Sequence, residues 1–227
     1  MNYKDTSKEN INAHIDRIID VVEEIVENGI GKVTILTGGN ACGKSVIRKL
    51  LPARLSNKLG IDTKEAGHLV CSTSMQLRTS GSSNYDIIAS GMGRMSADLP
   101  WLSTSEQTIH LVQQLFSSCV EKVEDESKKN FIVIDELEIG MSKETQLGAC
   151  IWLNKIIKEN KEKILGVLVI THSDTVVQNI ESDNFINIDG MNREEWINRE
   201  IIPVMPDDLS AWATELFVGI RDREKKS

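Results

Sequence analysis

One octapeptide limits the possible folds of this chain more than any other feature. Residues 38–45 have the sequence G-G-N-A-C-G-K-S, which fits the pattern G-x-x-x-x-G-K-[ST] without a mismatch. The β-branched residues 33–37 precede it, and we expect a helix that begins at Gly43, is kinked or interrupted at Pro52 and ends near Gly60. A strand, a glycine-rich turn and a helix in this order aim several backbone N–H groups at one point. The octapeptide therefore predicts a loop that holds the phosphates of a nucleotide.

Each position of this loop has an expected task. Glycines are needed because the backbone must bend around a polyphosphate without side chains in the way. Lys44 should reach the β- and γ-phosphates, and the Ser45 hydroxyl should ligate Mg²⁺. The residues expected to contact the nucleotide are Gly38, Gly39, Asn40, Ala41, Cys42, Gly43, Lys44 and Ser45.

Apolar runs with the length of buried strands alternate with helical patterns along the chain. Strands are expected at residues 33–37, 68–71, 131–134, 164–171 and 185–188. Helices are expected at residues 9–28, 43–60, 109–123, 145–157 and 207–221. This alternation predicts an α/β fold of the P-loop NTPase type, with a mainly parallel sheet flanked by helices on both faces.

The chain contains no internal repeat and no obvious linker, and its 227 residues are enough for one large α/β domain. We therefore expect a single domain over residues 1–227. Its expected parts are an N-terminal helix at 1–29, an irregular lid or loop at 78–100, a helix at 101–128, and a C-terminal helix and tail at 207–227.

Charge and cysteine usage restrict location and partners. The net charge of −8 disfavours a broad nucleic-acid footprint but leaves a local basic stripe open. No apolar run approaches the roughly 20 residues that a membrane helix needs, and the polar start lacks the apolar region of a signal peptide. The four cysteines are widely spaced, which favours reduced thiols over disulfides or a zinc site. We expect a cytoplasmic protein without a membrane span.

Two carboxylates follow the strand expected at residues 131–134. Asp135 should lie beside the phosphate loop and hold Mg²⁺ through water, and Glu136 should polarise the water that attacks the γ-phosphate. A strand that ends in solvated acids is a common alternative. The phosphate loop upstream favours the functional interpretation.

Two further positions have both a structural and a functional interpretation. Ser103 and Glu106 fit an S-x-x-E capping box, and the same helix start could bind the γ-phosphate of a nucleotide held by a second molecule. His172 follows the strand expected at 164–171, at the sheet edge where ligands bind, although a surface histidine is the simpler interpretation. The histidines interpreted as structural are His14, His68 and His110. No cluster has metal-ligand spacing, so Mg²⁺ brought by the nucleotide is the only metal expected.

The order and spacing of these motifs resemble the ABC-type ATPases, in particular the soluble branch that includes the SMC and RecF proteins. The resemblance covers residues 33–173, and its most specific parts are the phosphate loop and the Asp135–Glu136 pair. It implies a compact ABC-type ATPase head that binds and hydrolyses ATP with Mg²⁺. It further implies that Lys44 and Ser45 hold phosphate and metal, with Asp135 supporting the metal.

The resemblance also assigns roles outside these motifs. It implies that Glu136 is the catalytic base and that His172 senses the γ-phosphate. Ser103 would reach across a head-to-tail dimer to the nucleotide of the partner. Gln76 would be the glutamine that links Mg²⁺ to the lid.

Three positions depart from the pattern of that family. Thr104 and Ser105 stand where two glycines usually follow the signature serine, and Ser142 replaces the usual D-loop aspartate. No aromatic residue occurs between Tyr3 and Tyr85, so the adenine-stacking residue that transporter subunits carry before the phosphate loop is missing. A preference for ATP over GTP is implied by the resemblance alone.

The leading hypothesis is an ATPase whose two copies close head to tail around two ATP molecules and reopen after hydrolysis. A related ATPase subunit could replace the second copy, and DNA metabolism, a phage or defence system and a partner-protein complex are all open as the process it serves. One alternative is a slow-turnover, nucleotide-gated regulatory subunit of a larger complex. A P-loop kinase with Arg78 and Arg94 in its lid is a second alternative, and a transporter subunit a weaker one.

Overall fold

The computed structural model describes residues 3–61, 69–73, 103–121 and 129–224. The strands are β1 (Val33–Thr37), β2 (Val70–Thr73), β3 (Asn130–Asp135), β4 (Ile164–Ile170) and β5 (Asn184–Asn187). The helices are α1 (Lys8–Asn28), α2 (Lys44–Leu59), α6 (Thr104–Glu121), α7 (Lys143–Asn160), α8 (Asp174–Asn179), α9 (Arg193–Ile197), α10 (Pro206–Glu224) and the 3₁₀ turn η3 (Lys161–Lys163). The expected α/β class with a parallel sheet is confirmed.

The strands form one five-stranded parallel sheet in the order β2-β3-β4-β1-β5. Strand β4 therefore lies between β1 and β3, although it follows both in the sequence. Leu36 of β1 and Asp135 of β3 are both in register with Ile170 of β4. The segments that leave these three strands consequently emerge level with one another at the carboxyl edge of the sheet, where open α/β sheets bind ligands.

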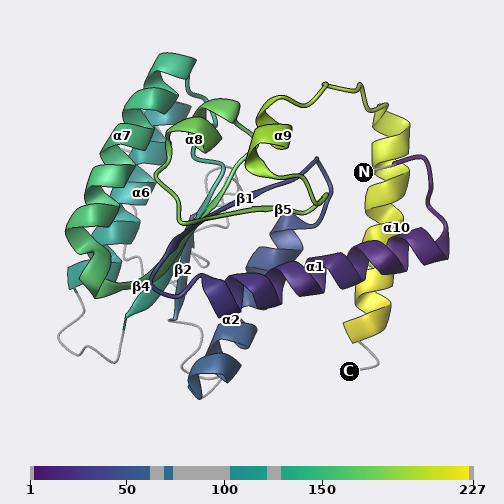
Figure 1. The fold of residues 1–227 in the computed structure, drawn as a ribbon, viewed down its shortest axis with the longest axis horizontal. Helices are drawn as coiled ribbons and strands as arrows, with labels where there is room; N and C mark the ends of the chain where they lie inside the picture. The colour runs from purple at the N-terminus through teal and green to yellow at the C-terminus, as the bar shows by residue number, and fades with distance from the viewer. Residues whose placement is uncertain (1–2, 62–68, 74–102, 122–128, 225–227) are drawn as a thin grey trace.

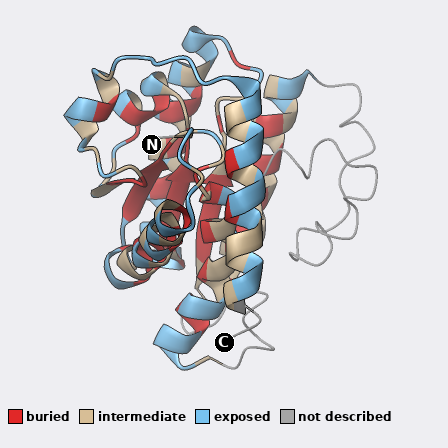
Figure 2. Cartoon of the chain, turned by 90° about the vertical axis from the view of Figure 1, so that its right-hand side faces the viewer, coloured by how far each residue is buried: buried red, intermediate tan, exposed pale blue. Residues whose placement is uncertain are grey.

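Both faces of the sheet are covered by helices, and each face has its own hydrophobic core (Figure 1). Side chains alternate along a strand, so Ile132 and Ile134 of β3 face the core under α6 and α7, whereas Phe131 and Val133 face the core under α1 and α2. Figure 2 shows the buried residues on the strands and on the inward helix faces, with exposed residues outside. This burial on both faces explains why the strands are continuously apolar.

Helix α2 continues through Pro52 and ends at Gly60, so the expected interruption is absent. Leu51 and Leu55, on either side of the proline, are fully buried in the core under α1. Tertiary packing therefore holds the helix across a residue that disfavours it. Gly60 adopts a left-handed conformation (φ 66°), as expected of a helix end.

The short helices α8 and α9 were not expected, because five or six residues are too few to show a helical period. The expected lid at 78–100 lies outside the described residues, as do Gln76, His68 and residues 122–128. None of the helices in the described ranges combines the length and the hydropathy needed to cross a bilayer.

Candidate functional site

The loop between β1 and α2 packs closely against the N-terminal segment at two glycines. Gly43 has φ 98°, and a Cβ there would lie 2.3 Å from Ile18 Cδ1 of α1. A Cβ on Gly39 would lie 2.1 Å from the Tyr3 hydroxyl oxygen. Tyr3 and Ile18 of the N-terminal segment therefore pack closely against the loop, and the positive φ of Gly43 favours glycine there.

The ammonium group of Lys44 lies inside the loop that precedes it. Its Nζ donates to the carbonyl oxygens of Gly38 at 3.1 Å and of Gly39 at 2.8 Å, and the residue is buried. A cation enclosed by the curve of the loop, next to the start of α2, forms a positive centre suited to phosphate.

Residues from outside the loop hold its backbone in place. The Tyr3 hydroxyl donates to the Asn40 carbonyl at 2.8 Å, and His14 Nε2 donates to the Cys42 carbonyl at 2.9 Å. Burial raises the pKa of Tyr3 to about 12 and lowers the pKa of His14, so both are neutral donors at pH 7. The structural role expected for His14 thus takes the form of a support for the phosphate loop.

Asp135 ends β3 opposite α2 and lies 3.6 Å from Arg48. Arg48 follows Lys44 by one helical turn, so both cations project toward the carboxyl edge of the sheet. Burial raises the pKa of Asp135 to about 6; the carboxylates of Glu136 and Glu138 add to this, while Arg48 and Lys44 oppose it. Arg48 was missed in the sequence because it belongs to no motif, and only its i+4 spacing from Lys44 could have indicated it.

Glu136 and His172 face each other at the same edge, with His172 Nε2 3.9 Å from Glu136 Oε1. Burial lowers the pKa of His172 to about 4, with further lowering from Lys44 and Arg199, so the imidazole is neutral at pH 7. Glu136 has a left-handed backbone (φ 58°), which is strained for a residue with a side chain. Strain of this kind clusters at functional sites.

Glu138 is a second residue that the sequence analysis missed. Its Oε1 accepts a hydrogen bond of 2.7 Å from the backbone N–H of His172, which ties the turn after β3 to the end of β4. Burial raises the pKa of Glu138, against the lowering effect of that hydrogen bond. The only indication of Glu138 in the sequence is that it is the third carboxylate in Asp135-Glu136-Leu137-Glu138. Its hydrogen bond positions the backbone of His172.

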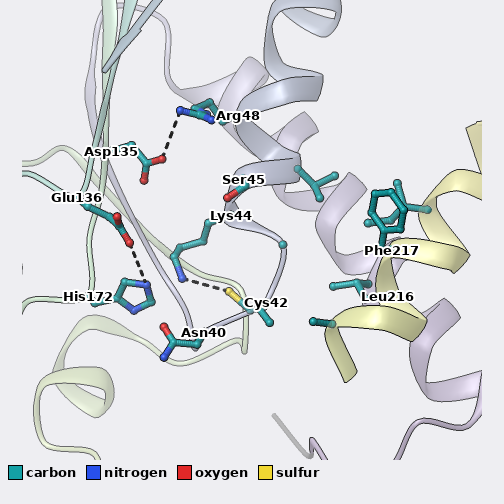
Figure 3. A pocket seen from close by; sticks show the side chains of 15 residues that line it. Asn40, Cys42, Lys44, Ser45, Arg48, Asp135, Glu136, His172, Leu216 and Phe217 are labelled. Atoms are coloured by element: carbon teal, nitrogen blue, oxygen red, sulfur yellow. Dashed lines mark hydrogen bonds and ion pairs between the residues drawn. The ribbon is translucent and has the colours of Figure 1, made fainter. Parts of the chain in front are cut away.

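Lys44, Arg48, Asp135, Glu136 and His172 share one cavity of about 480 Å³, within the usual range of ligand pockets (Figure 3). Its lining consists of the loop from Asn40 to Ser45, then Val46, Arg48, Asp135, Glu136, His172, and Ala213, Leu216, Phe217 and Ile220 of α10. Gly38 and Gly39 line an adjoining cavity of about 610 Å³, which also includes His172 and Arg199. The structure thus brings together the expected phosphate loop, acid pair and histidine.

Ser103 does not line this cavity. It is exposed at the start of α6, where its N–H donates to Glu106 Oε2 at 2.8 Å and its hydroxyl accepts from the Glu106 N–H at 3.4 Å. The capping-box interpretation of Ser103 and Glu106 is confirmed. Within one chain, Ser103 is not part of the site.

The oxygen donors in the cavity suit Mg²⁺. The Ser45 hydroxyl and the Asp135 carboxylate line the same space, and hard oxygen ligands are those that Mg²⁺ prefers. Among the described residues, no group of three or more His, Cys, Asp or Glu forms a metal site by itself. The residues present therefore fit an ion that also takes ligands from phosphate and water.

Comparison with known proteins gives one informative similarity. The chain is 26% identical over 168 residues to the probable peptide export ATP-binding protein YydI of Bacillus subtilis (strain 168). The matched region covers 69% of this chain and 78% of that protein. No family model matches the chain.

Proposed function

We propose that this protein is an ABC-type ATPase that binds ATP with Mg²⁺ and hydrolyses it. The observation that carries the proposal is the single cavity that joins the phosphate loop to Asp135, Glu136 and His172. The similarity to a protein described as ATP-binding supports the same conclusion. We treat residues 1–227 as one ATPase domain, and its four cysteines, which are buried and form no disulfide, support a reducing, cytoplasmic location.

Each group of residues in the cavity has a different proposed role in the reaction. The loop N–H groups and Lys44 bind the β- and γ-phosphates, for which Lys44 Nζ exchanges its carbonyl partners for phosphate oxygens. Ser45 and Asp135 would hold Mg²⁺, and the ion would supply neutralisation of the charge on the phosphate oxygens. Glu136 orients and deprotonates the attacking water. His172 is neutral, so it acts as a hydrogen-bond partner of the water or the γ-phosphate and supplies no charge.

The finer proposal is a nucleotide-driven switch that works as a head-to-tail dimer, as in the soluble SMC and RecF branch. Ser103 is exposed and lies outside the cavity of its own chain, so it is available to complete the cavity of a partner. Closure around the γ-phosphate would favour the dimer, and hydrolysis would release it. Gln76 stays a proposed Mg²⁺ and lid contact. DNA metabolism or defence is one process that such a switch could serve.

A second candidate follows from the similarity itself. The relative is described as a probable peptide export protein, which favours a role as the ATP-binding subunit of an exporter. Such a subunit would sediment with membranes through a partner, whereas the soluble switch would not. Fractionation of cells that express the tagged chain together with the proteins encoded beside it distinguishes the two roles.

The decisive test is Glu136→Gln. Phosphate release should fall on the order of 100-fold or more, since a general base contributes about that much. Light scattering after gel filtration should show an ATP-dependent dimer that persists in this variant. Glu162→Gln, an exposed change at η3 on the opposite edge of the sheet, is the control and should behave as the wild type. Unchanged turnover in Glu136→Gln would refute Glu136 as the base.

A further inference from the structure

One wall of the phosphate cavity comes from the C-terminal helix α10. Ala213, Leu216, Phe217 and Ile220 line it, at the i, i+3, i+4 and i+7 spacing of one helix face. In Figure 3 the acids and His172 lie on one side of Lys44, and Leu216 and Phe217 lie on the other. All four side chains of this wall are apolar. The cavity therefore has a charged half that suits phosphate and metal, and an apolar half that suits neither.

Phe217 is the unusual member of this wall. The residue is 65% exposed, although it borders a concave site, and no ring contact of Phe217 occurs among the described residues. By contrast, Trp212 on the same helix is buried and makes edge contacts with two rings. An aromatic face left open in a cavity is suited to stack on a flat ligand.

The position of this wall relative to the phosphate loop is set by shared contacts. Trp212 packs edge-on against Tyr3, with centroids 6.0 Å apart, and against His14 at 5.4 Å. Tyr3 and His14 are the two residues that donate to the carbonyls of Asn40 and Cys42. The helix that carries Phe217 and the loop that would hold the phosphates are thus anchored on the same two side chains.

We propose that α10 is the nucleobase platform of this protein, with the ring of Phe217 stacked on the base. The inference rests on the proposed function, because it assumes that the loop binds the phosphates of a nucleotide. The platform would supply the aromatic contact for the base in a chain that has no aromatic residue between Tyr3 and Tyr85. Because the α10 side chains at this wall carry no hydrogen-bond donor or acceptor, the wall contacts the face of the base and does not distinguish its edge.

Equilibrium binding of ADP and of inorganic pyrophosphate to the full chain, measured by calorimetry with Mg²⁺, tests this platform. The two ligands share the phosphates and differ in nucleoside, and neither is hydrolysed by the proposed reaction. Phe217→Ala should weaken ADP binding about tenfold or more, as expected for loss of one base–aromatic stack. It should leave the affinity for pyrophosphate unchanged. Phe217→Trp should retain ADP binding. GDP should bind about as tightly as ADP.

Ile151→Ala on α7 is the matched control, since Ile151 is 63% exposed and does not line the cavity. It should change neither affinity. Equal ADP affinities for the wild type and Phe217→Ala would overturn the platform and leave the proposed function standing. An equal loss of pyrophosphate affinity in Phe217→Ala would overturn the platform too, because α10 would then support the loop and not the base. Wild-type protein that binds neither ligand would instead refute the proposed function.

Discussion

Asp135 and Glu136 are adjacent in the chain, yet their surroundings assign them different tasks. Asp135 is enclosed between β3 and α2, and its side chain is 13% exposed beside Arg48. Glu136 turns away with a left-handed backbone toward His172, and its side chain is 30% exposed. The enclosed carboxylate suits a metal, which would compensate its burial, and the more open one suits a water molecule.

The burial of Asp135 makes the metal-free protein sensitive to pH. Its folded-state pKa of about 6 lies above the value of 3.8 that is usual for an aspartate, so the unfolded chain releases this proton first as the pH rises. The carboxyl thus favours folding below about pH 4 and loses that effect between about pH 4 and 6. Asp135→Asn should therefore raise the free energy of unfolding by ~2 kcal/mol at pH 7.5 without Mg²⁺, and by much less at pH 4.

Urea unfolding at the two pH values checks this expectation, with EDTA present throughout. Asp174→Asn is a suitable control, because Asp174 also pairs with an arginine, Arg199, but its side chain is 50% exposed. If Asp135→Asn raised the free energy of unfolding equally at both pH values, the raised pKa of Asp135 would not be the cause.

At the scale of elements, the turn after β3 is closed by the cap of α7. Ser142, which stands where the ABC-type ATPases that the sequence resembles usually have an aspartate, accepts a hydrogen bond of 3.3 Å from the Thr145 N–H and begins this helix. Glu144 lies in its first turn, on the side that the helix dipole favours for a negative charge. Ser142 therefore caps α7, a role that an aspartate could also fill.

Replacing this cap gives a prediction at the same scale. Ser142→Ala should lower the free energy of unfolding by about 1 kcal/mol, because an N–H at the start of α7 loses its acceptor. Ser142→Asp should be close to neutral, since aspartate caps equally well. Urea unfolding of the three proteins at pH 7 measures the difference. An Asp variant as unstable as the Ala variant would contradict the capping role, since aspartate keeps an acceptor for the Thr145 N–H.

At the scale of the whole molecule, the proposed dimer divides each site between two chains. Lys44 belongs to the cavity, and Ser103 lies on the exposed start of α6 outside it. A chain that lacks one of these residues and a chain that lacks the other can therefore form one complete site when mixed. A protein that works as a monomer cannot regain activity in this way.

The test uses Lys44→Ala and Ser103→Asp. The aspartate keeps the helix cap but places a negative charge where the partner's γ-phosphate would lie, so each variant alone should lose most of its ATPase activity. Their mixture should recover part of it, as measured by phosphate release. Each variant alone, at the total protein concentration of the mixture, is the control. Full activity of Ser103→Asp alone would contradict a role in trans.

The phosphate loop, the five strands and the longer helices could be predicted from the sequence because each depends on neighbouring residues. A glycine turn between a strand and a helix, or an apolar run ending in Asp135 and Glu136, is visible within about ten residues. The capping of α6 by Ser103 and Glu106 is local in the same sense. The unbroken α2 is the exception, because buried Leu51 and Leu55 outweigh the proline between them.

The tertiary structure alone decided which of these pieces meet. The order of the strands places β4 between β1 and β3, and this puts His172 beside Glu136 and Arg48 beside Asp135. It also brings α10, from the far end of the chain, against the loop that begins at Gly38. Such contacts join residues that are far apart in sequence, so they depend on how the two faces of the sheet are covered and leave no periodic pattern. The sequence by itself determined a glycine-rich loop between a strand and a helix; the packing decided what surrounds it.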